Sequence, residues 1–192
     1  MKLVLLDRDG VINVSPGKSY VMSPSEMKLI EGAGNAISRL NEAQIKVAII
    51  TNQSIVGQGG LSLQNLDKIH DHLKSLLKRE NAFIDKIFFC PDSPCTPTYR
   101  RKPNPGMIHE ALNFFKAEAQ KTPFIGDSLT DLEAAFKAGC PRHLVRTGHG
   151  KEVEKQGIPI KYLPVIVHSD LEAAVKYLIK NRLMQNNQVI SV

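Results

Sequence analysis

Short apolar runs alternate with longer amphipathic stretches along this 192-residue chain, and that alternation leaves few possible folds. Each run has the length of a buried strand, as at residues 46–51. The stretches between the runs carry apolar side chains at helical spacing, for example Ile108, Ala111, Leu112 and Phe115. This pattern is typical of a parallel sheet with helices on both faces, so it predicts a doubly wound α/β fold. The strands are expected near residues 2–6, 46–51, 84–89, 123–125, 143–146 and 165–167.

The helical stretches also indicate where the domain ends. A short helix is predicted over residues 131–138, and the last helix is predicted to begin with a capping box formed by Ser169 and Glu172. After Arg182 the apolar residues no longer recur at helical spacing. We therefore expect one domain over residues 1–182 and a mobile C-terminal tail over residues 183–192.

The composition excludes several classes of protein. With 42% hydrophobic and 23% charged residues, the chain has the make-up of a globular domain that buries a core. No apolar run reaches the length of a membrane-spanning helix, and the N-terminus lacks the pattern of a signal peptide. We therefore expect a cytoplasmic protein without a membrane partner, in which Cys90, Cys95 and Cys140 are reduced thiols.

The charge balance leaves the type of partner open. Lys and Arg number 25 against 19 Asp and Glu, a net charge of +6, which suits nucleic acid or an anionic small molecule. The densest basic stretch, Arg100 to Lys102, is short and has few aromatic residues around it, so we do not expect a nucleic-acid partner. Nothing in the sequence indicates the oligomeric state.

Polar residues follow the predicted strands at the points where ligands bind in such folds. These points are the carboxyl ends of the strands, which share one edge of a parallel sheet. Asp7 and Asp9 follow the first strand, and Asp127 follows the fourth. The second strand leads into Thr51, Asn52, Gln53 and Ser54, and the loop after the third strand ends in Arg101 and Lys102.

This set of side chains suits covalent phosphoryl transfer. Asp7 can act as a nucleophile, with Asp9 as the neighbouring acid/base. Two close carboxylates repel an anionic substrate unless a divalent cation lies between them, and oxygen ligands favour Mg²⁺. Asp127 would complete the metal site, while Lys102 and the polar residues after the second strand would bind the phosphoryl group.

Each motif taken alone has a simpler explanation. An Asp-x-Asp pair after a strand commonly caps a helix or lies in solvent, and a Thr-Asn pair is a weaker signal still. All four elements nevertheless occur in the chain in one order, each after a predicted strand. Their convergence favours an active site over a purely structural role.

The four elements resemble the motifs of the haloacid dehalogenase superfamily of Mg²⁺-dependent phosphatases. The resemblance implies a Rossmann-like fold and a phosphoric monoester hydrolase made of a single phosphatase domain. It makes Asp7 the nucleophile and a metal ligand, Asp9 the general acid/base with its backbone carbonyl on the metal, Asp127 the third protein ligand and Asp131 a supporting residue. The matching segments are Asp7-x-Asp9-Gly10-Val11, Thr51-Asn52, Lys102 and Gly126-Asp127-x-x-x-Asp131.

A narrower resemblance is to the heptose-bisphosphate phosphatases and the related histidinol-phosphatases. It implies that Arg101 recognises the substrate, that Lys102 stabilises the phosphoryl group, and that residues 15–18 and 51–54 line the sugar or the phosphate. The segments that carry it are residues 6–13, 50–54, 101–107 and 144–148.

This resemblance implies a small phosphorylated metabolite as the substrate. The expected reaction is hydrolysis of D-glycero-D-manno-heptose 1,7-bisphosphate at position 7, a step of lipopolysaccharide core biosynthesis. Histidinol phosphate is the alternative substrate, because the same catalytic residues would serve it. A non-catalytic module that binds nucleic acid is the alternative of another class, although such a module has no need of all these acidic residues.

The chain departs from the narrower families in their zinc loop, which carries a Cys-x-His and a Cys-x-Cys pair. Here the first pair is replaced by Cys90 and Asp92, and Thr98 and Arg100 stand in the place of the second. Even with Cys95 as a substitute ligand, a fourth soft ligand is missing. We therefore expect no structural Zn²⁺ in this loop.

The expected substrate rim is also unusual. Ser128 stands where a lysine is frequent in these families, and residues 55–60 lack an arginine, so the rim carries less positive charge.

The connection over residues 11–32 is too short for an independent cap domain, and an open site bordered by loops is expected. His70 and His72 lie on a long amphipathic stretch and are expected in solvent.

Overall fold

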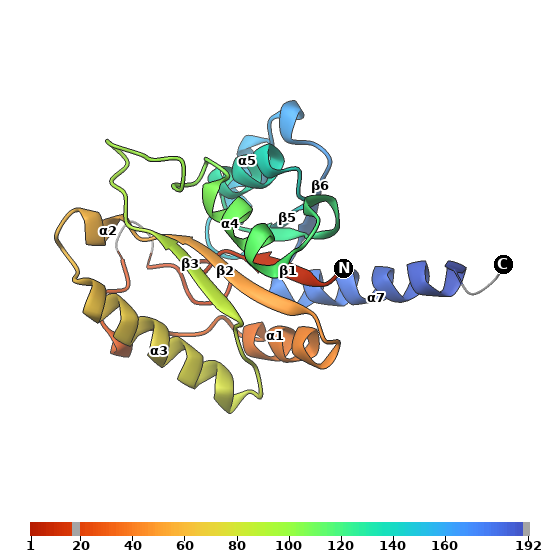
Figure 1. Ribbon diagram of the computed structural model, residues 1–192, viewed down its shortest axis with the longest axis horizontal. Coiled ribbons are helices and arrows are strands. Elements are labelled where there is room, and N and C mark those ends of the chain that lie inside the picture. Colours follow the sequence, from red (N-terminus) through yellow and green to blue (C-terminus); the bar gives the residue numbers. More distant parts are fainter. Residues whose placement is uncertain (17–19, 190–192) are drawn as a thin grey trace.

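Six parallel strands form one sheet in the computed structural model, which describes residues 1–16 and 20–189, with side chains as far as residue 184. They are β1 Leu3–Leu6, β2 Lys46–Asn52, β3 Lys86–Cys90, β4 Phe124–Gly126, β5 Arg142–Val145 and β6 Val165–His168. Their order across the sheet is β3-β2-β1-β4-β5-β6. The chain winds outward from β1 in one direction, then returns to β4 and winds the other way (Figure 1). The predicted doubly wound α/β fold is confirmed.

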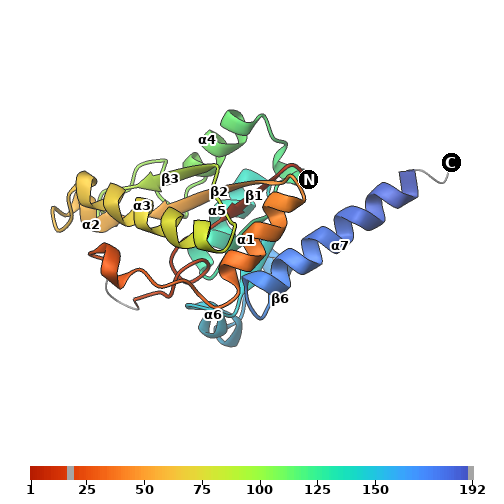
Figure 2. The same cartoon turned by 90° about the horizontal axis from the view of Figure 1, so that it is seen from below.

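Helices cover both faces of this sheet. In the described ranges they are α1 Ala33–Glu42, α2 Ser54–Gly57, α3 Leu63–Arg79, α4 Gly106–Phe115, α5 Leu129–Ala138, α6 Gly150–Gln156 and α7 Leu171–Val189. Helices α1, α3 and α7 pack on one face, and α4 and α5 pack on the other (Figures 1 and 2). The described residues form no separate cap domain, as expected. Among them, no helix has both the length and the apolar character needed to cross a membrane.

Strand β1 contributes to the two larger hydrophobic cores. Successive side chains of a strand point to opposite faces of its sheet. Val4 and Leu6 pack in the core beneath α1, α3 and α7, while Leu3 and Leu5 pack in the core beneath α4 and α5. All four side chains are fully buried, and each such burial contributes about 1.5–3 kcal/mol. The strand is therefore held from both sides, which fixes the position of Asp7, the residue that follows it.

Two helix boundaries differ from the predicted ones because of their capping residues. Helix α5 begins at Leu129, two residues earlier than expected, since Ser128 caps it and accepts a hydrogen bond from the Asp131 backbone N–H. At the start of α7, the Asp170 carboxylate accepts a hydrogen bond from the Ala173 backbone N–H at 2.8 Å. The predicted capping box of Ser169 and Glu172 was wrong, because Glu172 instead accepts a hydrogen bond from Asn35 of α1.

Helix α7 continues beyond the domain boundary expected at Arg182. Its backbone is helical to Val189, and the last turns extend away from the rest of the molecule (Figures 1 and 2). Part of the expected tail is thus helical, and residues 190–192 lie outside the described residues. The mobility of the segment from residue 183 stays a prediction.

A buried pair of imidazoles makes the stability of this fold depend on pH. His143 Nδ1 lies 2.9 Å from His168 Nε2, the two rings are nearly parallel, and the ring of Tyr177 of α7 is tilted against both. Burial, His168 and Arg142 together lower the pKa of His143 to about 3. Below pH ~6.5 the unfolded chain therefore binds a proton at this imidazole that the folded protein does not bind. The free energy of unfolding thus decreases as the pH is lowered.

We expect the free energy of unfolding to fall by about 2 kcal/mol for this imidazole between pH 6.5 and 5, at about 1.4 kcal/mol per pH unit. Urea denaturation at about pH 7 and about pH 5 measures the difference. His143→Gln should remove about 2 kcal/mol of it, whereas His72→Gln, outside the pair, should leave it unchanged. Equal pH dependence in wild type and His143→Gln would contradict the assignment.

Candidate active site

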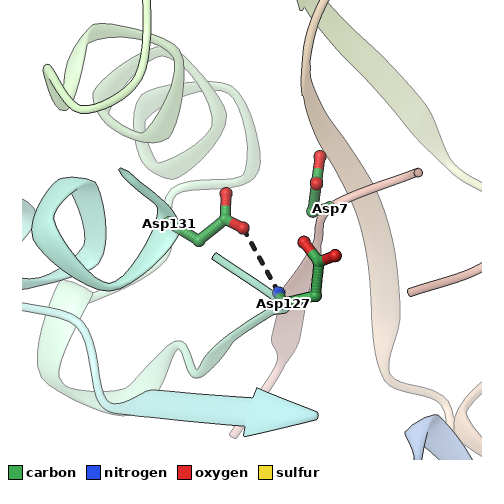
Figure 3. Close-up of side chains that lie close together, drawn as sticks. All are labelled: Asp7, Asp127 and Asp131. Atoms are coloured by element: carbon green, nitrogen blue, oxygen red, sulfur yellow. Dashed lines mark hydrogen bonds between the residues drawn. The ribbon is translucent and has the colours of Figure 1, made fainter. Parts of the chain in front are cut away.

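Three carboxylates converge at the carboxyl ends of the central strands. Asp7 follows β1, Asp127 follows β4, and Asp131 lies in the first turn of α5. All three are buried, and one oxygen of each lies within 4.8 Å of an oxygen of the other two (Figure 3). The neighbours β1 and β4 are the strands between which the chain changes its winding direction, where ligands bind in folds of this type.

The three acidic groups destabilise one another's charges. Burial raises the pKa of Asp7 well above its usual range, and the nearby Asp131 and Asp127 raise it further against the lowering effect of Lys102. Burial and Asp131 likewise raise the pKa of Asp127 to about 7. A divalent cation between these carboxylates would favour their ionised forms. The oxygen-only donor set therefore fits a hard cation such as Mg²⁺.

Asp131 differs from the other two carboxylates because both of its oxygens are already engaged. Its Oδ1 accepts a hydrogen bond from Lys102 Nζ at 2.6 Å. Its Oδ2 accepts from the Ser128 backbone N–H at 3.1 Å, from Ser128 Oγ at 2.6 Å and from the Asp127 backbone N–H at 3.3 Å. These contacts hold the loop that carries Asp127. The arrangement supports the predicted supporting role rather than that of a metal ligand.

Lys102 is the cation of the site. It is buried, and its Nζ donates hydrogen bonds to Asp7 Oδ1 and to the Ile50 carbonyl oxygen, both at 2.8 Å, besides Asp131. Burial lowers the pKa of Lys102, but Asp131 and Asp7 outweigh this and raise it above its usual value. The Asn52 side chain fixes the lysine backbone, accepting from its N–H at 3.1 Å and donating to its carbonyl oxygen at 3.0 Å.

Asp9 lies at the edge of the same site, with its side chain 26% exposed. Arg8 contacts the carboxylate with two guanidinium nitrogens, and the amides of Asn13 and Gln53 donate to it at 2.9 and 3.1 Å. Burial raises the pKa of Asp9, but Arg8 and the two amides outweigh burial and lower it. His70 contacts Arg8 from α3 and is only 5% exposed, so the expectation that it lies in solvent was wrong.

The predicted residues are divided between the cavity and its supporting structure. A cavity of about 190 Å³ is lined by Asp7, Asp9, Thr51, Asn52, Lys102 and Asp127. Gln53 and Ser54 are buried behind it, where Gln53 donates to Thr51 Oγ1 at 2.9 Å and Ser54 Oγ lies 2.9 Å from the Tyr20 hydroxyl. Arg101 is not among the lining residues, and its guanidinium donates to the Asp92 carbonyl oxygen at 2.8 Å.

Several lining residues were not identified from the sequence. The cavity is also bordered by Tyr20, Thr130 and His149, besides Ser15 and Pro16 of the expected loop over residues 15–18 and Ser128 of the expected substrate rim. Residues 17 and 18 lie outside the described residues. The Ser128-x-x-Asp131 spacing is a capping-box signal, and it could have identified the start of α5 as part of the site.

Two glycines allow the backbone to approach Asp127. Gly10 and Gly148 have φ angles of +85° and +56°, and a Cβ on either would come within 2.1 Å of Asp127 Oδ2. The loop after β5 is joined to this region because Thr147 Oγ1 donates to the Gly10 carbonyl oxygen and the His149 backbone N–H donates to Asp127 Oδ2. Only glycine fits at these two positions without displacing the carboxylate.

The loop after β3 pairs its own polar groups where the narrower families carry zinc ligands. Asp92 accepts hydrogen bonds from the Thr98 backbone N–H and hydroxyl and contacts the Cys90 thiol, while Arg100 pairs with Glu110 at 2.7 Å. Cys95 is exposed. These residues do not fit a tetrahedral zinc site. The absence of bound Zn²⁺ stays a prediction, which elemental analysis of the purified protein tests.

Comparison with known proteins gives consistent results. The family model described as HAD-hydrolase-like matches residues 99–174. The D-glycero-beta-D-manno-heptose-1,7-bisphosphate 7-phosphatase of Bordetella bronchiseptica is 40% identical over 157 residues, which cover 82% of this chain and 87% of that protein. The enzyme of the same name from Pseudomonas putida is 36% identical over 179 residues, 93% of this chain and 100% of its own length.

Solved structures lead to the same group. The crystal structure of the B. bronchiseptica D,D-heptose 1,7-bisphosphate phosphatase, complexed with magnesium and phosphate, superposes with a TM-score of 0.88 at 37% identity. It covers 94% of this chain and 99% of that one. Identity of this level over nearly the whole length, on a shared fold, places this chain in the heptose-1,7-bisphosphate 7-phosphatase family of haloacid dehalogenase-like hydrolases.

Proposed function

We propose that this protein is a Mg²⁺-dependent phosphatase that removes the 7-phosphate of D-glycero-D-manno-heptose 1,7-bisphosphate through an aspartyl-phosphate intermediate. The observation that carries the proposal is the convergence of Asp7, Lys102 and Asp127 on one cavity at the switch point of the sheet. The substrate follows from the relatives, which are phosphatases of this sugar bisphosphate.

The proposed reaction has two steps, phosphorylation of Asp7 and hydrolysis of the aspartyl-phosphate. An oxygen of the Asp7 carboxylate attacks phosphorus, and the bond from phosphorus to the sugar oxygen breaks. Asp9 gives a proton to that oxygen, which requires the anionic phosphate beside Asp9 to oppose Arg8 and the two amides that lower the Asp9 pKa in the free protein. A water molecule then attacks the aspartyl-phosphate and gives a proton to Asp9, while the bond between phosphorus and Asp7 breaks. Lys102, 2.8 Å from Asp7, stabilises the negative charge that develops on the phosphoryl oxygens.

Asp7 and Asp127, with the Asp9 backbone carbonyl, would hold the Mg²⁺. The bound ion would neutralise the charges of the phosphate and of the two carboxylates, which repel each other in its absence. Asp131 would take no direct part, because protein donors already engage both of its oxygens.

The cavity suits a substrate that is bound mainly through its phosphate. At about 190 Å³ it is smaller than most ligand pockets, so the sugar would extend past the residues at its border. Tyr20, Ser128, Thr130 and His149 are among the side chains there that can hydrogen-bond to sugar hydroxyls. Arg101, held by the Asp92 carbonyl, would need to leave this contact to reach the substrate.

Phosphate release from a panel of substrates tests the reaction and the specificity together. With Mg²⁺ present, the heptose 1,7-bisphosphate should be hydrolysed with a kcat/KM well above those of histidinol phosphate, fructose 1,6-bisphosphate and an aryl phosphate. Preference for histidinol phosphate would identify the alternative substrate. Hydrolysis of none of them, together with salt-dependent binding of DNA or RNA, would favour the nucleic-acid-binding module instead.

The metal assignment predicts a specific loss in Asp127→Asn. This variant keeps the size of the side chain but removes one of the two carboxylate ligands, so we expect its Mg²⁺ affinity to fall by more than about 100-fold. Mg²⁺ at about 100 times its Kd should stabilise the wild type by about 2.7 kcal/mol, and the variant far less. Thermal unfolding across a Mg²⁺ titration measures both.

Asp67→Asn, on the exposed side of α3, is the matched control and should respond to Mg²⁺ like the wild type. A chelator should abolish activity, and added Mg²⁺ should restore it. An Asp127→Asn protein with the Mg²⁺ response of the wild type would remove Asp127 from the metal site.

A further inference from the structure

Arg8, between the two catalytic aspartates in the sequence, is among the most deeply buried large side chains of the described residues, with 1% exposure. Its Nη2 donates to Asp9 Oδ2 at 2.8 Å and to Oδ1 at 3.0 Å, and its Nε lies 3.3 Å from Oδ1. A planar guanidinium that contacts both oxygens fixes the orientation of the carboxylate as well as its distance.

His70 holds the guanidinium from the other side. Its Nε2 lies 3.1 Å from Arg8 Nη1, and both side chains are buried. Because a guanidinium can only donate, His70 Nε2 must accept this hydrogen bond, so the imidazole is neutral with its proton on Nδ1. Burial, Arg8 and Lys74 lower the pKa of His70 to about 3, in agreement with a neutral ring.

Two buried amides show that Asp9 is the centre of this network. Asn13 and Gln53 turn their NH₂ groups toward the Asp9 carboxylate, at 2.9 and 3.1 Å. Their own carbonyl oxygens are buried without a hydrogen-bond partner among the described residues. Such an unpaired acceptor costs about 1–3 kcal/mol. Reversing either amide would place its oxygen against the Asp9 carboxylate, and reversing that of Asn13 would also break its hydrogen bond to the Val14 carbonyl oxygen at 3.0 Å.

We propose that Arg8 and His70 are positioning residues, which together hold the Asp9 carboxylate at the edge of the cavity in the orientation needed for proton transfer. The inference rests on the proposed function, because it assumes that Asp9 exchanges protons with the leaving group and with water. Neither residue lines the cavity, so neither contacts the substrate there. Their effect on the reaction passes through Asp9.

This role predicts a loss in kcat without a comparable change in KM. Asp9 acts on the leaving oxygen and on water during the two transfer steps, whereas Lys102 and Thr51 bind the phosphate in the ground state as well. A misplacement of a catalytic group by about 1 Å can cost about 100-fold in rate. We expect Arg8→Met to lower kcat about 100-fold and His70→Leu about 10-fold, each with KM within about twofold of the wild type.

A conservative replacement separates positioning from packing. His70→Gln keeps an acceptor near the place of Nε2, so it should recover most of the kcat that His70→Leu loses. His72→Leu, on the same helix but outside the network, is the matched control and should leave kcat unchanged. Thermal unfolding of each variant shows whether it is folded at the assay temperature.

Pre-steady-state kinetics with an aryl phosphate give a readout that a merely structural role would not change. An aryl leaving group needs little protonation, so Asp7 should still be phosphorylated quickly in Arg8→Met and His70→Leu. Hydrolysis of the aspartyl-phosphate needs Asp9 as a base and should be slow. We therefore expect a burst of about one equivalent of phenolate per enzyme, followed by a slow steady state.

The outcomes distinguish this inference from the proposed function. If the wild type releases no phosphate from any substrate, the proposed function fails and the inference fails with it. If the wild type is active and Asp9→Asn is not, the function stands, and the variants decide the inference. A His70→Leu kcat within twofold of the wild type, a His70→Gln as slow as His70→Leu, or a burst that merely shrinks with the folded fraction would each overturn it.

Discussion

Asp7→Asn is expected to abolish phosphate release, with a fall in kcat of about 10⁴-fold or more, while the protein stays folded. An amide is a poor nucleophile toward phosphorus, so no aspartyl-phosphate can form. The substitution removes one of three mutually repelling carboxylates and keeps the size of the side chain. Since burial and its acidic neighbours already raise the pKa of Asp7, loss of its charge should leave the thermal midpoint unchanged or raise it.

Two measurements check this expectation. Phosphate release is followed over at least four decades of rate, and the unfolding transition is recorded for the same preparation. Asp67→Asn, the same chemical change at an exposed position of α3, should retain full activity. Normal turnover by a folded Asp7→Asn protein would show that another residue is the nucleophile.

Lys102→Met should reduce kcat by about 10²–10³-fold, the effect of removing a preorganised cation from a developing phosphoryl charge. It should also lower the free energy of unfolding by about 3–5 kcal/mol at neutral pH, because Asp131 and Asp7 would keep buried charges without their partner. Methionine nearly matches the lysine stem in length, so the loss reports the missing ammonium group and not a cavity.

The pH dependence of this destabilisation has a definite sign. Without Lys102, the pKa of Asp7 should rise further in the folded protein, since the lysine lowers it in the wild type. A raised folded-state pKa means that the folded protein binds protons more readily than the unfolded chain, so stability increases as pH falls. The free energy of unfolding that the variant loses relative to the wild type should therefore be smaller at about pH 5.5 than at about pH 8.

Urea denaturation at the two pH values measures the deficit. Lys121→Met removes an exposed ion pair with Glu118 and should cost less than about 1 kcal/mol at either pH. An equally small cost for Lys102→Met would mean that its three hydrogen bonds do not stabilise the fold. An unchanged kcat would remove Lys102 from the chemistry.

Local features explain which parts of the fold were predicted correctly from the sequence and which were not. The strands were predictable because their apolar runs must be buried on both sides, and in β1 every side chain is. The end of α5 at Gly139 was predictable because that residue adopts the left-handed conformation, with φ of +75°. The start of α7 was mistaken because Ser169 and Asp170 are both good capping residues, and only the backbone geometry selects Asp170.

The candidate site divides in the same way. The residue types after the strands indicated Asp7 and Asp127, since a charged group directly after a buried strand needs a particular reason to be there, and Lys102 at the end of the loop after the third strand. The sequence did not indicate that Arg101 would donate to the Asp92 carbonyl or that Gln53 would donate to Asp9. These roles depend on which way a side chain points from a loop, and no periodicity in the sequence records that direction.

The sequence by itself determined the class of fold, the order of the strands along the chain and the acidic groups able to carry the chemistry, because hydrophobic periodicity and residue type are local properties. Only the tertiary structure decided which of those groups meet, that both oxygens of Asp131 are engaged, and that His70 lies against Arg8 although 62 positions separate them. Such pairings arise when helices pack on a sheet and enclose polar groups, since a buried donor or acceptor must then find its partner wherever the fold brings one within reach.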